Sequence, residues 1–155
     1  DSLSLPKQMS PYSRLRLFLA LSRTPHAMMD MATPGLAALL FLDGFPPLEV
    51  TLIGLITVFA GYTSVYALND LMDYQIDRIK VTQGEFEGRK GYLDSAIVGH
   101  PLARGLLGLR ESLSWVIAWG VLALVGAYIL HPICALIFLG GCAREAVYCL
   151  MWRIS

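Results

Sequence analysis

The sequence predicts an all-α membrane protein with four transmembrane helices. Hydrophobic residues make up 55% of the chain and charged residues only 15%, with twelve basic side chains balancing twelve acidic ones. The charges also leave long gaps: residues 48–68 carry only Glu49, and residues 112–130 carry none. A helix needs about 20 apolar residues to cross the hydrocarbon core of a bilayer. These two segments are therefore predicted spans, and the zero net charge argues against a nucleic-acid partner.

Two further segments are predicted to cross the membrane. Residues 132–151 have the required length, although they carry Arg144 and Glu145. Ionisable residues inside a span are usually paired or functional, so these two are expected to face the bundle or a partner chain. Residues 25–42 form a weaker candidate, and Pro34-Gly35 within them predicts a kink.

The first part of the chain, residues 1–24, is predicted to be a separate interfacial segment. Tyr12, Leu15 and Leu19 recur at helical spacing, with Arg14 and Arg16 between them. Such a pattern is typical of a short amphipathic helix that lies in the membrane surface. Residues 25–155 then form the transmembrane helical domain.

The distribution of basic residues predicts the topology. Basic side chains precede the first predicted span, occupy the segment 78–111 and follow the last span, whereas the other two connections have none. The positive-inside rule therefore places both ends of this segment of chain, and the 78–111 loop, on the cytoplasmic side.

An acidic motif, Asn69-Asp70-x-x-Asp73-x-x-x-Asp77, follows the second span. On one helix these aspartates stand at i, i+3 and i+7, so their carboxylates project from one face. Like charges this close repel one another unless a cation lies among them. Mg²⁺ prefers a few carboxylates together with water and phosphate oxygens. The motif thus predicts a Mg²⁺ site for a phosphate or diphosphate; the alternative is a solvated acidic helix end.

Tyr62 and Tyr66 continue the face of the aspartates toward the bilayer. They are predicted to line a cavity that is polar at one end and apolar at the other. The alternative places Tyr66 in an interfacial aromatic belt and Tyr62 in the bundle packing. Small residues elsewhere on this helix predict close contact with neighbouring helices; they are Gly54, Thr57, Gly61 and Ser64.

The cytoplasmic loop supplies cations that would suit a diphosphate. Arg78, Lys90 and Arg104 are the candidates, and anionic lipid headgroups are an equally good alternative for each. His100, which precedes Pro101, is expected to be structural because no second histidine stands at a spacing suited to sharing a metal.

Together these features resemble the N-terminal half of the UbiA superfamily of intramembrane prenyltransferases. The resemblance rests on the N-D-x-x-D-x-x-x-D motif, on Arg78 directly after it, and on a Pro-Leu-x-x-Gly turn at residues 101–105 before the third span. Tyr148 and Arg153 add a weaker match to the end of the family's fourth helix.

The resemblance implies an all-α bundle of nine helices around a lipid-facing cavity. It also implies transfer of a prenyl group from an isoprenyl diphosphate to an aromatic or other acceptor, through an allylic carbocation. Asn69, Asp70, Asp73 and Asp77 would form the first of two aspartate motifs that bind Mg²⁺ and the diphosphate. The acceptor is left open among quinone-ring precursors, tetrapyrroles and sugar phosphates.

Two features depart from the family pattern. The second aspartate motif does not occur in the sequence, and His100 stands where the family commonly has arginine. The sequence is therefore expected to be either part of a longer enzyme or a non-catalytic membrane subunit or lipid-binding scaffold. That scaffold would have kept the fold and lost the chemistry.

Overall fold

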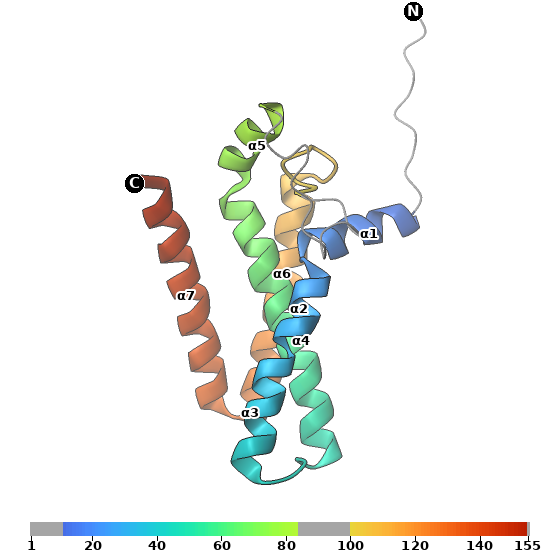
Figure 1. The fold of residues 1–155 in the computed structure, drawn as a ribbon, viewed down its shortest axis with the longest axis vertical. Helices are drawn as coiled ribbons and strands as arrows, with labels where there is room; N and C mark the ends of the chain where they lie inside the picture. The colour runs from blue at the N-terminus through green and yellow to red at the C-terminus, as the bar shows by residue number, and fades with distance from the viewer. Residues whose placement is uncertain (1–10, 84–99, 155) are drawn as a thin grey trace, which may run out of the picture.

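The computed structural model describes residues 11–83 and 100–154, and the regular elements within these residues are all α-helices (Figure 1). In chain order the helices are α1 (Pro11–Leu21), α2 (Thr24–Asp30), α3 (Ala32–Leu42), α4 (Leu48–Met72), α5 (Tyr74–Thr82), α6 (Leu109–Leu130) and α7 (Pro132–Ile154). The all-α prediction is confirmed.

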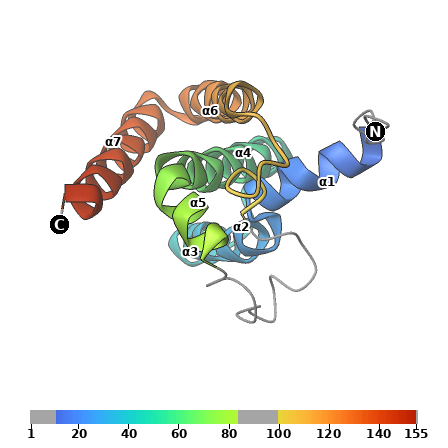
Figure 2. The ribbon, with the colours of Figure 1, turned by 90° about the horizontal axis from the view of Figure 1, so that it is seen from above.

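Helix α4 is the centre of the arrangement. Figure 2 shows α4 between α6 on one side and the α2–α3 pair on the other, with α7 continuing from α6. Helix α1 lies across the long axis near one end (Figure 1). The same end carries α5, the turn before α6 and the C-terminal end of α7. We call this end of the molecule the motif end. The α3–α4 turn lies at the opposite end.

Two of the four predicted spans are confirmed as candidates. Within the described residues, α4 and α6 are the two helices long and apolar enough to cross a membrane. Only 28% of the most apolar window of α4 and 17% of that of α6 are buried. The core helix of a soluble protein hides its apolar surface, so this outward apolar surface is typical of a helix that faces lipid.

The kink predicted within residues 25–42 is present, and the crossing of a membrane by this segment stays a prediction. Helix α2 ends at Asp30 and α3 begins at Ala32, so the break falls about one turn before the Pro34-Gly35 pair. Proline has no backbone N–H to donate to the carbonyl four residues earlier, and its ring clashes with that carbonyl. The carbonyl concerned is that of Asp30, which explains the position of the break.

The fourth predicted span coincides with α7, and its crossing of a membrane stays a prediction. In α7, Arg144 is exposed and Glu145 is half-buried. The predicted loop 78–111 is shorter in the structure, because α5 continues to Thr82 and α6 begins at Leu109. Residues 84–99 of that loop lie outside the described residues.

The predicted N-terminal helix is present as α1, and one side of it packs against the protein. Leu17 and Leu21 are buried against Leu102, Leu107 and Val116. The predicted apolar stripe included Leu15, which is 49% exposed, and Leu19, which is half-buried. Tyr12 and residues 1–10 of the segment lie outside the described side chains. Contact with the turn before α6, rather than helical spacing alone, selects the buried face of α1.

Small residues bring α4 and α6 into close contact, as predicted for three of the four positions. The Ser64 hydroxyl donates a hydrogen bond of 3.0 Å to the Val116 carbonyl. A Cβ on Gly126 would lie 2.1 Å from the Thr57 hydroxyl oxygen, and one on Gly61 would touch Phe138 of α7. Gly54 is the exception, because nothing lies within 4 Å of its Cβ position.

Candidate active site at the α4–α5 junction

The acidic motif lies where α4 meets α5. The predicted single continuous helix is wrong: α4 ends at Met72, Asp73 separates the helices with φ −85° and ψ −2°, and α5 begins at Tyr74. Helical hydrogen bonds nevertheless bridge the break, from the Asp73 amide to Asn69 and from the Asp77 amide to Asp73. The bend therefore leaves all three carboxylates at the motif end.

Asp70 is buried in the last turn of α4 and is paired with Arg23. Its side chain is 3% exposed, and Nη2 of Arg23 donates to its Oδ1 at 3.0 Å. A buried carboxylate is rarely tolerated without such a partner. Arg23 comes from the turn between α1 and α2, where its φ of 45° places it in the left-handed region. That strained backbone directs its side chain to Asp70.

The turn that carries Arg23 is held on both sides of it. Ser22 is fully buried, and its hydroxyl accepts a hydrogen bond of 2.9 Å from the Trp115 indole on α6. The Thr24 hydroxyl donates a bond of 2.9 Å to the Leu19 carbonyl. These bonds tie the turn to α1, α2 and α6. The Arg23 guanidinium at Asp70 is therefore part of the fold rather than a mobile surface group.

Asp77 is also buried, and it faces His100 from the turn before α6. Its residue is 8% exposed, and Nδ1 of His100 lies 3.0 Å from its Oδ2. His100 has a left-handed φ of 50°, and burial of Pro101 and Leu102 anchors the turn behind it. The hydrogen bond to Asp77 raises the pKa of His100, against the opposing effect of burial. The imidazolium form is therefore favoured beside the carboxylate.

Asp73 differs from its two neighbours. It is half-buried, and within the described residues it has no ion pair, whereas Asp70 and Asp77 each have one. Burial raises the pKa of Asp73 first, followed by the charge of Asp77. The charges of Arg23 and Lys80 oppose this effect, and that of Glu145 on α7 adds slightly to it. Among the described residues, Asp73 is thus the motif carboxylate that has no ion pair for an added cation to displace.

The two tyrosines lie beside the acidic motif on the α2 side of α4. Their rings stack with centroids 6.3 Å apart. The Tyr66 hydroxyl donates a short hydrogen bond to Asp30 at the end of α2. Tyr66 therefore connects α4 to the broken first span.

The predicted loop cations are not gathered at the carboxylates. Arg78 stays on the surface of α5, where it donates to the Tyr74 hydroxyl at 3.1 Å. Arg104 is exposed in the turn before α6, and Lys90 lies outside the described residues. Asn69 is half-buried in the last turn of α4, next to Asp70.

Arg23, His100 and Asp30 hold positions in this site that the sequence did not assign to them. Arg23 contributed to the topology alone, and His100 was expected to be structural. The signal that could have found them is physical: carboxylates predicted at the end of an apolar helix need counter-charges from elsewhere. The sequence does not say which of its cations are close enough.

The donor types at the junction fit Mg²⁺, whereas their present positions do not converge on one point. Carboxylate oxygens are the ligands that this cation prefers. In the described part of the chain, no three acidic, histidine or cysteine side chains are grouped so as to hold a metal ion. Two of the three carboxylates point instead to Arg23 and His100.

Comparisons with known proteins bear on what this junction does. Neither the comparison with curated proteins nor the one with solved structures found a match. A model of the UbiA prenyltransferase family matches residues 31–155, a range that includes the whole acidic motif and helices α3 to α7. The match covers far more than half of the 155 residues, so this chain belongs to the UbiA prenyltransferase family.

Proposed function

We propose that the protein takes part in Mg²⁺-dependent transfer of a prenyl group from an isoprenyl diphosphate to an aromatic or other acceptor within the membrane. The observation that carries the proposal is the junction of α4 and α5. There Asp70, Asp73 and Asp77 lie together at the end of an apolar helix, in a family of prenyltransferases. A trianionic diphosphate would be repelled from such a site without a divalent cation.

Asp70, Asp73 and Asp77 would hold the cation, and Asn69 would contact the diphosphate beside it. When bound, Mg²⁺ would offset the negative charge that builds on the departing diphosphate. Arg23 and His100 supply positive charge next to the same carboxylates and limit their mutual repulsion. Arg78, Lys90 and Arg104 remain proposed contacts for the diphosphate, as do Tyr62 and Tyr66 for the prenyl group.

The two apolar helices and the family indicate an integral membrane protein. We propose that the motif end faces the cytoplasm, because the predicted cytoplasmic basic residues belong to this end. The crosswise direction of α1 at the same end supports its proposed place in the membrane interface (Figure 1).

Replacement of Asp73 by asparagine tests the proposal. Asp73→Asn keeps size and polarity and removes one charge, so we expect Mg²⁺-dependent prenyl transfer to fall by about 100-fold or more, in line with loss of a group that acts in the transition state. The measurement is transfer of radiolabelled prenyl groups to candidate acceptors by the full protein in membranes.

Asp43→Asn is the matched control. Asp43 is an exposed aspartate at the opposite end, with a left-handed φ of 52° that asparagine also tolerates. Its activity should equal that of the wild type. Unchanged turnover in Asp73→Asn would remove the acidic motif from the mechanism and favour the non-catalytic scaffold.

A further inference from the structure

Helix α1 has two sides in different surroundings. Leu17 and Leu21 on one side are buried against α6 and the turn before it. Leu15 stands about 160° around the helix from Leu17. It is 49% exposed, and Leu19, one turn further along the same side, is half-buried. Because α1 lies across the long axis and extends sideways from the other helices (Figures 1 and 2), this second side is suited to enter the boundary between lipid headgroups and acyl chains.

Arginines flank the open apolar side of α1. Arg14 and Arg16 stand directly before and after Leu15, and both side chains are exposed. Neighbouring helical positions are about 100° apart, so the two arginines lie on either side of Leu15. An arginine in such a place can lay its apolar stem along the membrane and keep its guanidinium at the level of the headgroups.

Arg14 is held in position by the start of α6. Its Nη2 donates to Oε2 of Glu111 at 2.6 Å, and the same oxygen accepts a bond of 3.4 Å from the Gly108 amide. A guanidinium has five N–H groups, so one such bond leaves others for a further anion. The Arg14 side chain is also 46% exposed. Glu111 therefore orients Arg14 without using all of its donors.

Arg110 adds a third exposed cation, next to Glu111 in the sequence. At helical spacing it shares one side of α6 with Ile117 and Val121, which are both 55% exposed. This side belongs to the outward apolar surface that is typical of a helix facing lipid. Arg110 thus stands at the head of that surface, where headgroups would lie. We call Arg14, Arg16 and Arg110 the arginine patch.

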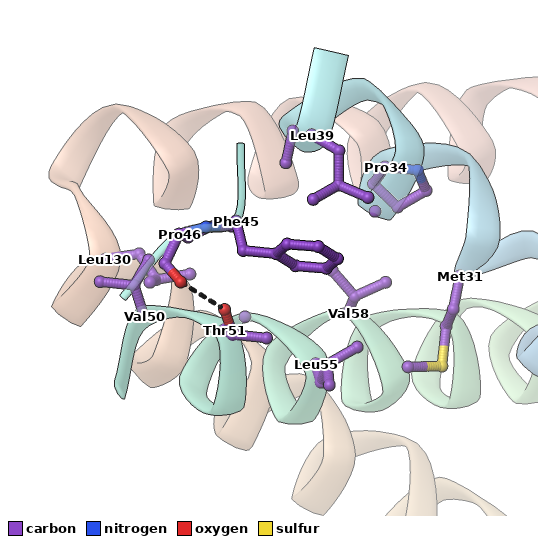
Figure 3. A pocket seen from close by; sticks show the side chains of 13 residues that line it. Met31, Pro34, Leu39, Phe45, Pro46, Val50, Thr51, Leu55, Val58 and Leu130 are labelled. Carbon is purple, nitrogen blue, oxygen red and sulfur yellow. Dashed lines mark hydrogen bonds between the residues drawn. The ribbon is translucent and has the colours of Figure 1, made fainter. Parts of the chain in front are cut away.

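The opposite end of the molecule carries charges of the other sign. Residues 24–77 contain no lysine or arginine, and the exposed charged side chains around the α3–α4 turn are Asp43 and Glu49. An apolar cavity between α3 and α4 lies near this turn, and its described lining has no charged side chain (Figure 3). An anionic headgroup would therefore be repelled at this end and attracted to the arginine patch.

We propose that the arginine patch binds an anionic phospholipid. The phosphate would lie between Arg14 and Arg110, and the acyl chains would follow Leu15 and the outward side of α6. Guanidinium groups donate paired hydrogen bonds to phosphate oxygens, and they repel the ammonium group of a zwitterionic phospholipid. Arg16 would add to the attraction of the anionic surface. The site is separate from the aspartates, so the inference does not depend on the proposed function.

The test measures lipid binding to the full protein by native mass spectrometry from detergent micelles. The probes are phosphatidylglycerol and phosphatidylcholine with the same acyl chains. We expect the wild type to bind phosphatidylglycerol more tightly by about tenfold or more, because its headgroup is anionic. This preference should shrink as the salt concentration rises, since salt screens exposed charges.

The double variant Arg14→Gln with Arg110→Gln removes the two cations assigned to the phosphate. We expect it to bind phosphatidylglycerol about tenfold or more weakly and phosphatidylcholine as before. Both side chains are exposed, so the variant should keep the wild-type unfolding midpoint in micelles without added lipid. Arg144→Gln is the matched control, because it removes an exposed arginine on α7, away from α1, and it should bind both lipids like the wild type.

The same measurement can contradict the inference in three ways. Equal affinity of the wild type for the two lipids would mean that the patch does not distinguish headgroup charge. An unchanged preference in the double variant, or an equal loss in Arg144→Gln, would mean that the patch is not the site. Glycerol 3-phosphate carries a phosphate without acyl chains. If it displaced phosphatidylglycerol at equal concentration, the patch would be a site for soluble phosphates instead of a lipid.

Discussion

The two faces of α4 differ in how closely neighbouring helices pack against them. The face toward α6 is packed so closely that Thr57 occupies the space beside Gly126, and Ser64 hydrogen bonds to the α6 backbone. The face toward α2 and α3 is held by two polar contacts, Asp70 with Arg23 and Tyr66 with Asp30, and then opens into a cavity.

The comparison shows that a small residue in a membrane helix has two opposite uses. Gly126 permits backbones to approach, which is the usual source of helix association in lipid. Gly54 leaves space that no neighbouring side chain fills. The first use stabilises the fold, whereas the second leaves open space beside the helix and contributes little to stability.

Removing the Arg23 charge from the side of α4 that faces α2 should have the largest effect on stability. Arg23→Gln leaves the Asp70 carboxylate buried without its partner, and we expect the free energy of unfolding to fall by about 2–4 kcal/mol, because breaking a buried pair strands a charge. The measurement is chemical unfolding in detergent micelles. Adding Asp70→Asn to this variant should recover part of the loss, because the stranded charge is then gone.

Arg14→Gln is the control for Arg23→Gln. Arg14 pairs with Glu111 at 2.6 Å, and both side chains are nearly half exposed. Water and salt screen such a pair, so we expect no measurable change in stability. Equal losses in the two variants would contradict a buried ion pair at Asp70.

Crowding the α6 face should have the next largest effect. In Gly126→Ala the new Cβ would stand 2.1 Å from the Thr57 hydroxyl oxygen, so the helices must shift or Thr57 must rotate. We expect a loss of about 1–3 kcal/mol, which is typical of overpacking. The same unfolding assay measures it. Pairing the variant with Thr57→Ala, which removes the clashing hydroxyl, should restore much of the stability.

The same substitution on the cavity face should have the smallest effect, with the opposite sign. Gly54→Ala adds a methyl group where nothing lies within 4 Å, and alanine restricts the unfolded chain. We expect a gain of about 0.4–1 kcal/mol in the same assay. A loss as large as that of Gly126→Ala would mean that the two faces of α4 are packed alike.

Much of the fold could be predicted from single residues and their spacing. The long uncharged segments identified α4 and α6, because apolar length is a local property of the sequence. The acidic motif was predicted to follow the second span, and it lies where α4 ends and α5 begins. The Pro34-Gly35 pair also predicted a kink, and the helix breaks at Met31 because proline acts on the carbonyl four residues before it.

The partners of the buried carboxylates could not be predicted in this way. Arg23 and His100 lie 47 and 23 positions from the aspartates they contact, and both act from left-handed turns. Spacing along one helix cannot identify contacts between turns that are far apart in sequence.

The sequence by itself determined the two candidate membrane spans α4 and α6, the acidic motif and its resemblance to a prenyltransferase family. These features depend on composition and on periodicity within one segment. Only the tertiary structure decided which cations neutralise Asp70 and Asp77, and on which face of α4 space remains. Both depend on how helices that are far apart in sequence pack together. That packing sets the free energy of burying a charge and the space left between side chains.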